Sequence, residues 1–166
     1  LSYFALSLGL VDKIKNSNDP RIINVSSNAH KRYKIDINDL KNKENYSGWK
    51  AYCRSKLLNI FFTYSFKNKL KTKINMNCLH PGFVNSNFGN NNENIYRFLI
   101  NILKYLFAID SDKAALSPLN LALNQDFKNV NGKYFFKLQE KKSSKESYDM
   151  ELANQIWDKS LEYLKL

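Results

Sequence analysis

Arg21-Ile22-Ile23-Asn24-Val25-Ser26-Ser27 sets the architecture of this chain. Its β-branched residues predict a short buried strand, and two hydroxyl side chains follow at the end of that strand. In open α/β sheets, ligands bind beyond the carboxyl ends of the strands. These residues therefore predict a strand of a parallel sheet that ends at a functional site.

A helix and a second strand complete the predicted unit. Residues 74–79 form another strand-like run, which leads into His80-Pro81-Gly82-Phe83-Val84. Between the two runs, a helix over residues 50–71 is indicated by two apolar stripes at helical spacing. The stripes consist of Leu57, Phe61 and Tyr64, and of Leu58, Phe62, Phe66 and Leu70. Strand, helix and strand in this order predict a right-handed crossover of a parallel sheet, and hence an α/β fold.

Tyr52 and Lys56 lie four residues apart on this predicted helix, within Tyr52-Cys53-Arg54-Ser55-Lys56. Positions i and i+4 share a helix face, so the ammonium group can sit beside the phenol. A nearby positive charge favours the ionised form of a phenol, which suits it to exchange a proton with an alcohol or carbonyl. The spacing alone also fits a half-exposed aromatic beside a solvated lysine, so the surrounding motifs decide between the two readings.

Those motifs resemble the short-chain dehydrogenase/reductase family, and within it the retinol-dehydrogenase-like branch. The resemblance runs from one end of the chain to the other, and the gap between Ser27 and Tyr52 suits this branch better than the wider family. It is carried by residues 21–30, 51–60, 80–86 and 131–135.

The resemblance implies a catalytic set of Ser27, Tyr52 and Lys56. Tyr52 would act as general acid/base, Lys56 would favour the ionised phenol and bind the nicotinamide ribose, and Ser27, rather than Ser26, would hold the substrate oxygen. The residues implied to contact the cofactor are Val25, Tyr52, Lys56, Pro81, Gly82, Val84 and Ser86. The implied reaction interconverts an alcohol and a carbonyl with NAD or NADP, of which the resemblance favours NADP.

The glycine-rich turn that holds the dinucleotide pyrophosphate in this family is not in the sequence. The five glycines, at positions 9, 48, 82, 89 and 132, form no G-x-G-x-x-G spacing. We therefore expect residues 1–166 to be a single partial domain, the C-terminal part of a longer protein whose N-terminal dinucleotide-binding half is missing. It would hold about three strands of a Rossmann-like doubly wound sheet, with the serine strand at an unpaired edge.

Two function classes follow from this expectation. In the first, the chain is the catalytic part of an oxidoreductase. In the alternative, it is a truncated, non-catalytic remnant of the fold that acts as an interaction module. Joint retention of Ser27, Tyr52, Lys56 and Pro81-Gly82 favours the enzyme, because drift without function tends to lose such a set.

The apolar run at residues 98–109 bears on substrate and membrane. It is too short to span a bilayer, which needs about 20 residues. The preferred interpretation is a lid over a lipophilic, retinoid-like substrate. Peripheral membrane contact through this run and a plain core helix are the alternatives. A homodimer through the helix at residues 50–71 is a further expectation, based on the resemblance and on the broad apolar surface of that helix.

Charge, cysteine and histidine content exclude other classes. The net charge is +11, but the lysines are dispersed and arginine occurs only at positions 21, 32, 54 and 97, so no nucleic-acid partner is predicted. Cys53 and Cys78 are typical of small buried hydrophobes in a reducing compartment. The expected location is therefore intracellular, either cytoplasmic or peripheral to an internal membrane. His30 and His80 have no partners at ligand spacing, and no metal site is predicted.

The remaining segments are predicted to be scaffold. Ser111 would cap a helix that runs to Leu123 and bends at Pro118. The last predicted elements are a strand at residues 133–136, a charged surface segment at 137–147 and an amphipathic helix at 149–164.

Overall fold

Four strands form one sheet in the order β1-β2-β3-β4. The computed structural model describes residues 1–41, 46–84 and 108–165. Strands β1 (Arg21–Val25), β2 (Asn75–His80) and β3 (Tyr134–Phe136) are parallel, and β4 (Gln139–Glu140) is antiparallel to β3. The sheet confirms the predicted α/β class, and β1 lies at an edge among the described strands, as expected.

β4 was not predicted, since its residues fell within the segment at 137–147 that was predicted to be a charged surface segment. The chain reverses at Lys137 and Leu138, both of which have positive φ angles, 49° and 61°. Two-residue turns of this kind favour asparagine and glycine, so a Lys-Leu pair gives no sequence signal for a hairpin. The turn brings Glu140 within 2.8 Å of the Lys133 ammonium, and a 3₁₀ turn, η3 (Lys145–Tyr148), follows.

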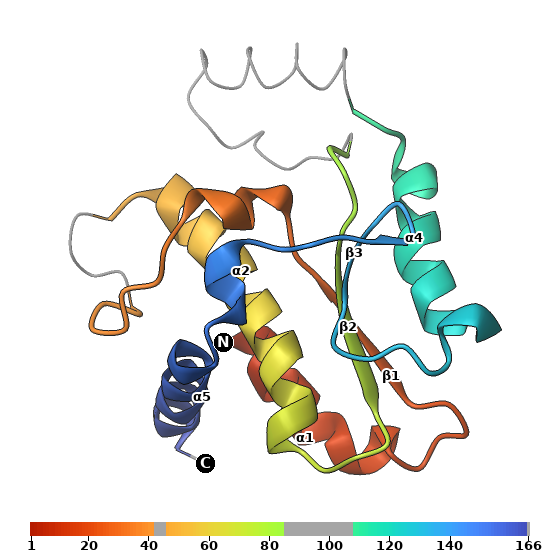
Figure 1. Cartoon of the computed structure of the whole chain (residues 1–166), viewed down its shortest axis with the longest axis horizontal. Coiled ribbons are helices and arrows are strands. Elements are labelled where there is room, and N and C mark those ends of the chain that lie inside the picture. The colour runs from red at the N-terminus through yellow and green to blue at the C-terminus, as the bar shows by residue number, and fades with distance from the viewer. Residues whose placement is uncertain (42–45, 85–107, 166) are drawn as a thin grey trace.

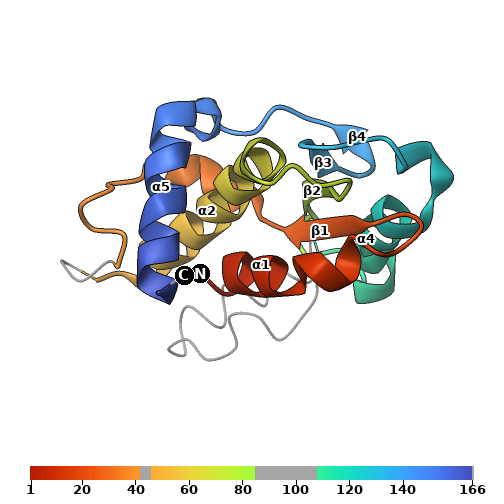
Figure 2. The same cartoon turned by 90° about the horizontal axis from the view of Figure 1, so that it is seen from below.

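Helices cover both faces of the sheet (Figures 1 and 2). Helices α1 (Ser2–Ile14) and α2 (Gly48–Lys69) pack on one face, with α5 (Met150–Leu164) packed against the outer side of α2, and α4 (Ser111–Leu123) packs on the other face. Alternation along β2 produces this division: Met76 lies in a cluster with α2 residues, whereas Leu79 contacts Leu121 of α4. The arrangement is doubly wound and Rossmann-like, as predicted.

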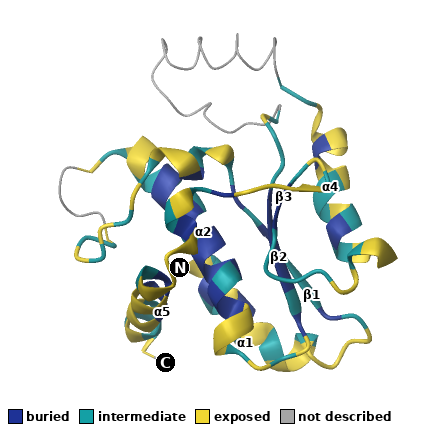
Figure 3. Cartoon of the chain, viewed as in Figure 1, coloured by how far each residue is buried: buried dark blue, intermediate teal, exposed yellow. Residues whose placement is uncertain are grey.

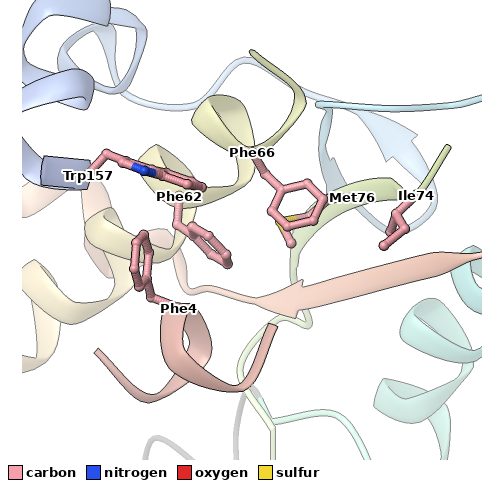
Figure 4. Packing of buried hydrophobic residues seen from close by; sticks show 6 residues of the cluster. All are labelled: Phe4, Phe62, Phe66, Ile74, Met76 and Trp157. Atoms are coloured by element: carbon pink, nitrogen blue, oxygen red, sulfur yellow. The ribbon is translucent and has the colours of Figure 1, made fainter. Parts of the chain in front are cut away.

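The largest core cluster joins three helices and β2. It consists of Phe4, Phe62, Phe66, Ile74, Met76 and Trp157 (Figure 4). The Trp157 ring of α5 stacks on Phe62 of α2 at a centroid distance of 5.8 Å and meets the edge of Phe4 of α1 at 4.8 Å. Figure 3 shows buried residues following α2 along much of its length. α2 is therefore the central helix, held between the sheet and α5.

This burial bears on the predicted homodimer. Leu57 and Phe61 of α2 pack against Ala153 and Ile156 of α5 within the same chain. The apolar surface on which the dimer prediction partly rested is therefore covered internally. Dimerisation stays a prediction supported by resemblance alone.

Most predicted elements occur with shifted ends. α2 begins and ends two residues earlier than predicted, and β2 begins one residue later. The predicted cap at Ser111 is wrong, because Asp110 is the N-cap and its side chain accepts from the Asp112 N–H at 2.9 Å. Pro118 lies inside α4 without ending it.

The expected lid at residues 98–109 lies outside the described residues, except for Ala108 and Ile109. Ile109 N donates to Phe83 O at 2.8 Å, and Ile109 forms a parallel bridge with Val84. The chain thus returns beside the Pro81-Gly82 loop before α4 begins. In the described part of the chain, no helix is long and apolar enough to cross a membrane.

Candidate active site

Three elements meet at the carboxyl edge of the sheet and line one open cleft of about 690 Å³. β1 and β2 end level with each other, since Val25 pairs with Leu79 and Ser26 N donates to Leu79 O at 2.6 Å. α2 adds a third wall. The lining consists of Val25, Ser26, Ser27, Asn28, Ala29, Arg32, Trp49, Tyr52, Lys56, Pro81, Gly82, Phe83 and Val84.

Nearly all of the sequence-predicted site residues come together in this cleft. Ser27, Tyr52 and Lys56 line it, as do Val25, Pro81, Gly82 and Val84. Ser86 lies outside the described residues. The fold brings these residues together in one cleft, and their catalytic and cofactor-binding roles are predictions.

Lys56 is held against the end of β1. Its Nζ donates to Val25 O at 3.2 Å and lies 5.6 Å from the centroid of the Tyr52 ring. Asn59 Nδ2, one turn further along α2, donates to the same carbonyl at 3.2 Å. Burial lowers the pKa of Lys56. The ammonium group is thus fixed beside the phenol, as the i, i+4 spacing predicts.

The two adjacent serines have different surroundings. Ser26 is 2% exposed, and its Oγ donates to Lys56 O at 2.7 Å, which joins β1 to α2. Ser27 Oγ accepts from Ala29 N at 3.2 Å. A hydroxyl that accepts in this way keeps its own proton to donate. Of the two serines, Ser27 is therefore the one suited to bind a substrate oxygen.

The Pro81-Gly82 turn depends on a glycine. Gly82 has φ +99°, and a Cβ there would lie 3.4 Å from Ile109 Cδ1. His80 Nδ1 accepts from Gly82 N at 3.0 Å, and the His80 ring stacks on Phe136 at 4.4 Å. Burial lowers the pKa of His80 to about 4, so its ring stays neutral and keeps accepting this bond. His80 is a strand-end residue, as predicted.

We predict that Gly82→Ala destabilises the fold by about 1–2 kcal/mol, because alanine is strained at positive φ. Gly9→Ala is the matched control. Gly9 lies in α1 with no atom within 4 Å of an added Cβ, and the change should stabilise the helix by up to about 1 kcal/mol. Urea unfolding of both variants measures the difference. Equal effects would contradict the assigned turn.

Six lining residues were not among the predicted site residues, and three of them bring large side chains to the cleft. Trp49 stacks on Tyr52 at a centroid distance of 5.8 Å, and its spacing of three residues from Tyr52 on a helix could have revealed it. Phe83 lies inside the predicted loop, but nothing marked its side chain. Arg32 lines the cleft from the 3₁₀ turn η1 (Asn28–Arg32), a turn that no local sequence pattern predicted.

In the parts of the chain that the structure covers, no cluster of three or more His, Cys, Asp or Glu side chains could hold a metal ion. Cys53 and Cys78 are free and buried. Burial raises the pKa of Cys78 to about 12, so it behaves as a small apolar side chain.

Comparison with known proteins supports the fold. A crystal structure of an uncharacterized protein from Mycobacterium paratuberculosis matches with a TM-score of 0.69 at 22% identity, over 98% of this chain and 55% of that one. This likeness shows the fold alone. No protein-family model matches the chain.

Sequence relatives are more specific. The chain is 36% identical over 166 residues to retinol dehydrogenase 13 of Mus musculus. The aligned region covers 96% of this chain and 50% of that protein. It is 32% identical to retinol dehydrogenase 14 of Mus musculus, with 95% of this chain and 48% of that protein aligned. It is 30% identical to polyprenol dehydrogenase of Homo sapiens, with 98% of this chain and 51% of that protein aligned. The chain spans about half the length of these curated relatives. The matches confirm the resemblance to short-chain dehydrogenases/reductases of the retinol-dehydrogenase-like branch.

Proposed function

We propose that residues 1–166 carry the catalytic residues of an NAD(P)-dependent oxidoreductase that interconverts a hydrophobic alcohol and its carbonyl. The observation that carries this proposal is the cleft itself, where Tyr52 and Lys56 on one face of α2 meet Ser27 at the end of β1. The names of the relatives, retinol and polyprenol dehydrogenases, support a lipophilic substrate.

In the direction of reduction, the Tyr52 hydroxyl donates a proton to the carbonyl oxygen, and in oxidation the phenolate accepts one from the alcohol. Ser27 donates a hydrogen bond to the same substrate oxygen. The Lys56 ammonium, held by Val25 O, would place a positive charge in the same cleft as Tyr52. Charge that develops on the substrate oxygen thus meets donors that are already in place.

The residues at the cleft fit the nicotinamide end of a dinucleotide. Gly82 lines the cleft, and a Cβ at that position would contact Ile109 and Phe136, which are not among the lining residues. Lys56 would hold the ribose, and Pro81, Gly82, Val84 and Ser86 would form the wall against the ring. The bound nicotinamide would supply or accept the hydride. Trp49 and Phe83 would limit access of water to the reacting atoms.

A substrate comparison tests the proposal. We expect the full-length gene product to oxidise retinol or a long-chain alcohol with kcat/KM at least about 100-fold above ethanol, because each buried methylene contributes about 0.8 kcal/mol. The rates are measured from the increase in absorbance at 340 nm as NADH forms from NAD, and in a separate assay as NADPH forms from NADP. A preference for the short alcohol would contradict the lipophilic substrate, and the absence of any turnover would favour the non-catalytic remnant.

A further inference from the structure

His30 lies three residues after Ser27 and is fully buried, at 0% exposure. Its backbone N–H and its ring Nδ1 both contact one acceptor, the Ser27 carbonyl oxygen, at 3.1 and 2.7 Å. On the other side of the ring, Nε2 lies 3.0 Å from the backbone nitrogen of Ser144. The ring therefore joins the predicted catalytic serine to a segment distant in sequence.

The two partners fix the protonation of the ring. A backbone N–H can only donate, so Nε2 must accept from Ser144 and carries no proton. Nδ1 then holds the single ring proton and donates it to Ser27 O. His30 is a neutral imidazole in one defined tautomer, set by its neighbours on both sides.

The segment that supplies the Ser144 N–H is itself well anchored. Ser143 Oγ lies 2.8 Å from Tyr64 OH of α2, and the Tyr64 ring stacks on Tyr148 at 5.3 Å. Glu146 Oε1 accepts from Ile35 N at 2.6 Å. Ser144 therefore presents its N–H from a segment that contacts both α2 and the chain after η1.

We propose that His30 is a positioning residue, which holds Ser27 in place for the reaction by bridging its carbonyl oxygen to the Ser144 N–H. Ser27 is then fixed at two points, since its Oγ also accepts from Ala29 N. Its hydroxyl proton remains available to a substrate oxygen. This inference rests on the proposed function.

The surroundings of His30 keep the ring neutral. Burial lowers its pKa, and the neighbouring Lys31 charge acts in the same direction, whereas the Ser27 carbonyl opposes them. Nearby His80 is also kept neutral by burial, and Tyr134, whose ring meets the His30 edge at 5.1 Å, has its pKa raised by burial. Glu146 is engaged by Ile35. A second proton, added as pH falls through the lowered pKa, would place Nε2–H against Ser144 N–H and break the bridge.

Two substitutions at Ser144 isolate the bridge. Ser144→Pro removes the N–H, and the native φ of −63° suits a proline ring. Ser144→Ala keeps the N–H and removes only a buried hydroxyl that has no hydrogen-bond partner. In the full-length protein we expect Ser144→Pro to lower kcat by about 10- to 100-fold with the dinucleotide KM unchanged, because small misplacements of reacting groups cost rates of this size. Ser144→Ala should stay within about twofold of the unaltered protein.

Nitrogen-15 NMR of the His30 ring provides a reading independent of turnover and of how either variant folds. The unaltered protein should show a proton on Nδ1 and a bare Nε2 at neutral pH. His30→Asn, whose amide can donate to Ser27 O without reaching Ser144, should retain more kcat than His30→Ala. Equal kcat for Ser144→Pro and Ser144→Ala would overturn the inference.

The outcomes also separate this inference from the proposed function. An active enzyme whose His30 carries its proton on Nε2 overturns the positioning role and leaves the proposed function standing. An inactive protein with the proton on Nδ1 overturns the proposed function, and with it any role of His30 in catalysis.

Discussion

Tyr52→Phe is expected to lower kcat of the full-length protein by about 10³-fold, because it removes the only atom of that side chain that can exchange a proton with the substrate. The ring and its stacking on Trp49 remain, so the cleft keeps its shape. Lys56 keeps its bond to Val25 O, which involves no atom of Tyr52. Dinucleotide affinity should therefore be nearly unchanged.

The measurement combines steady-state rates with dinucleotide titration by fluorescence or calorimetry. Tyr46→Phe makes the same chemical change on a side chain that is 72% exposed and does not line the cleft, and it should leave kcat within twofold. Retention of kcat by Tyr52→Phe would remove Tyr52 as the acid/base. A large loss of dinucleotide affinity would instead show that the Tyr52 hydroxyl binds the dinucleotide.

The central crossover could be read from the sequence because its signals are local. β1 is a β-branched run, α2 repeats its apolar residues at helical spacing, and the two strands end in residues that mark a site. Tyr52 and Lys56 needed only the helix period to be placed side by side. This part of the fold and most of the cleft followed from patterns within short windows.

The features that were missed depend on distant partners. The sequence predicted only that His30 has no metal-ligand partners, because its hydrogen-bond partner Ser144 lies 114 residues further along the chain. The hairpin turn at Lys137 and Leu138 uses positive φ angles that these residues rarely adopt. The covering of α2 by α5 likewise joins segments nearly a hundred residues apart, so an apolar face was interpreted as open when it is filled from within the chain.

Trp157→Ala should lower the free energy of unfolding by about 3–5 kcal/mol, the usual cost of removing a large aromatic from a core. Trp157 is 6% exposed and contacts both Phe4 and Phe62, so it packs α5 against α1 and α2. A cavity of about 110 Å³ already adjoins it. The truncation would enlarge this cavity, which the surrounding helices do not fill. We therefore expect the loss in the free energy of unfolding to lie toward the upper end of this range.

Trp49→Ala is the matched control, because it removes the only other tryptophan, a side chain that is 60% exposed. Its effect on stability should be below about 1 kcal/mol, whereas its loss from the cleft should appear in activity. Urea unfolding followed by circular dichroism compares the two without relying on tryptophan fluorescence. If Trp157→Ala cost no more than Trp49→Ala, α5 would not hold α2 in place, and the position of Tyr52 and Lys56 would have to depend on the sheet face of α2 alone.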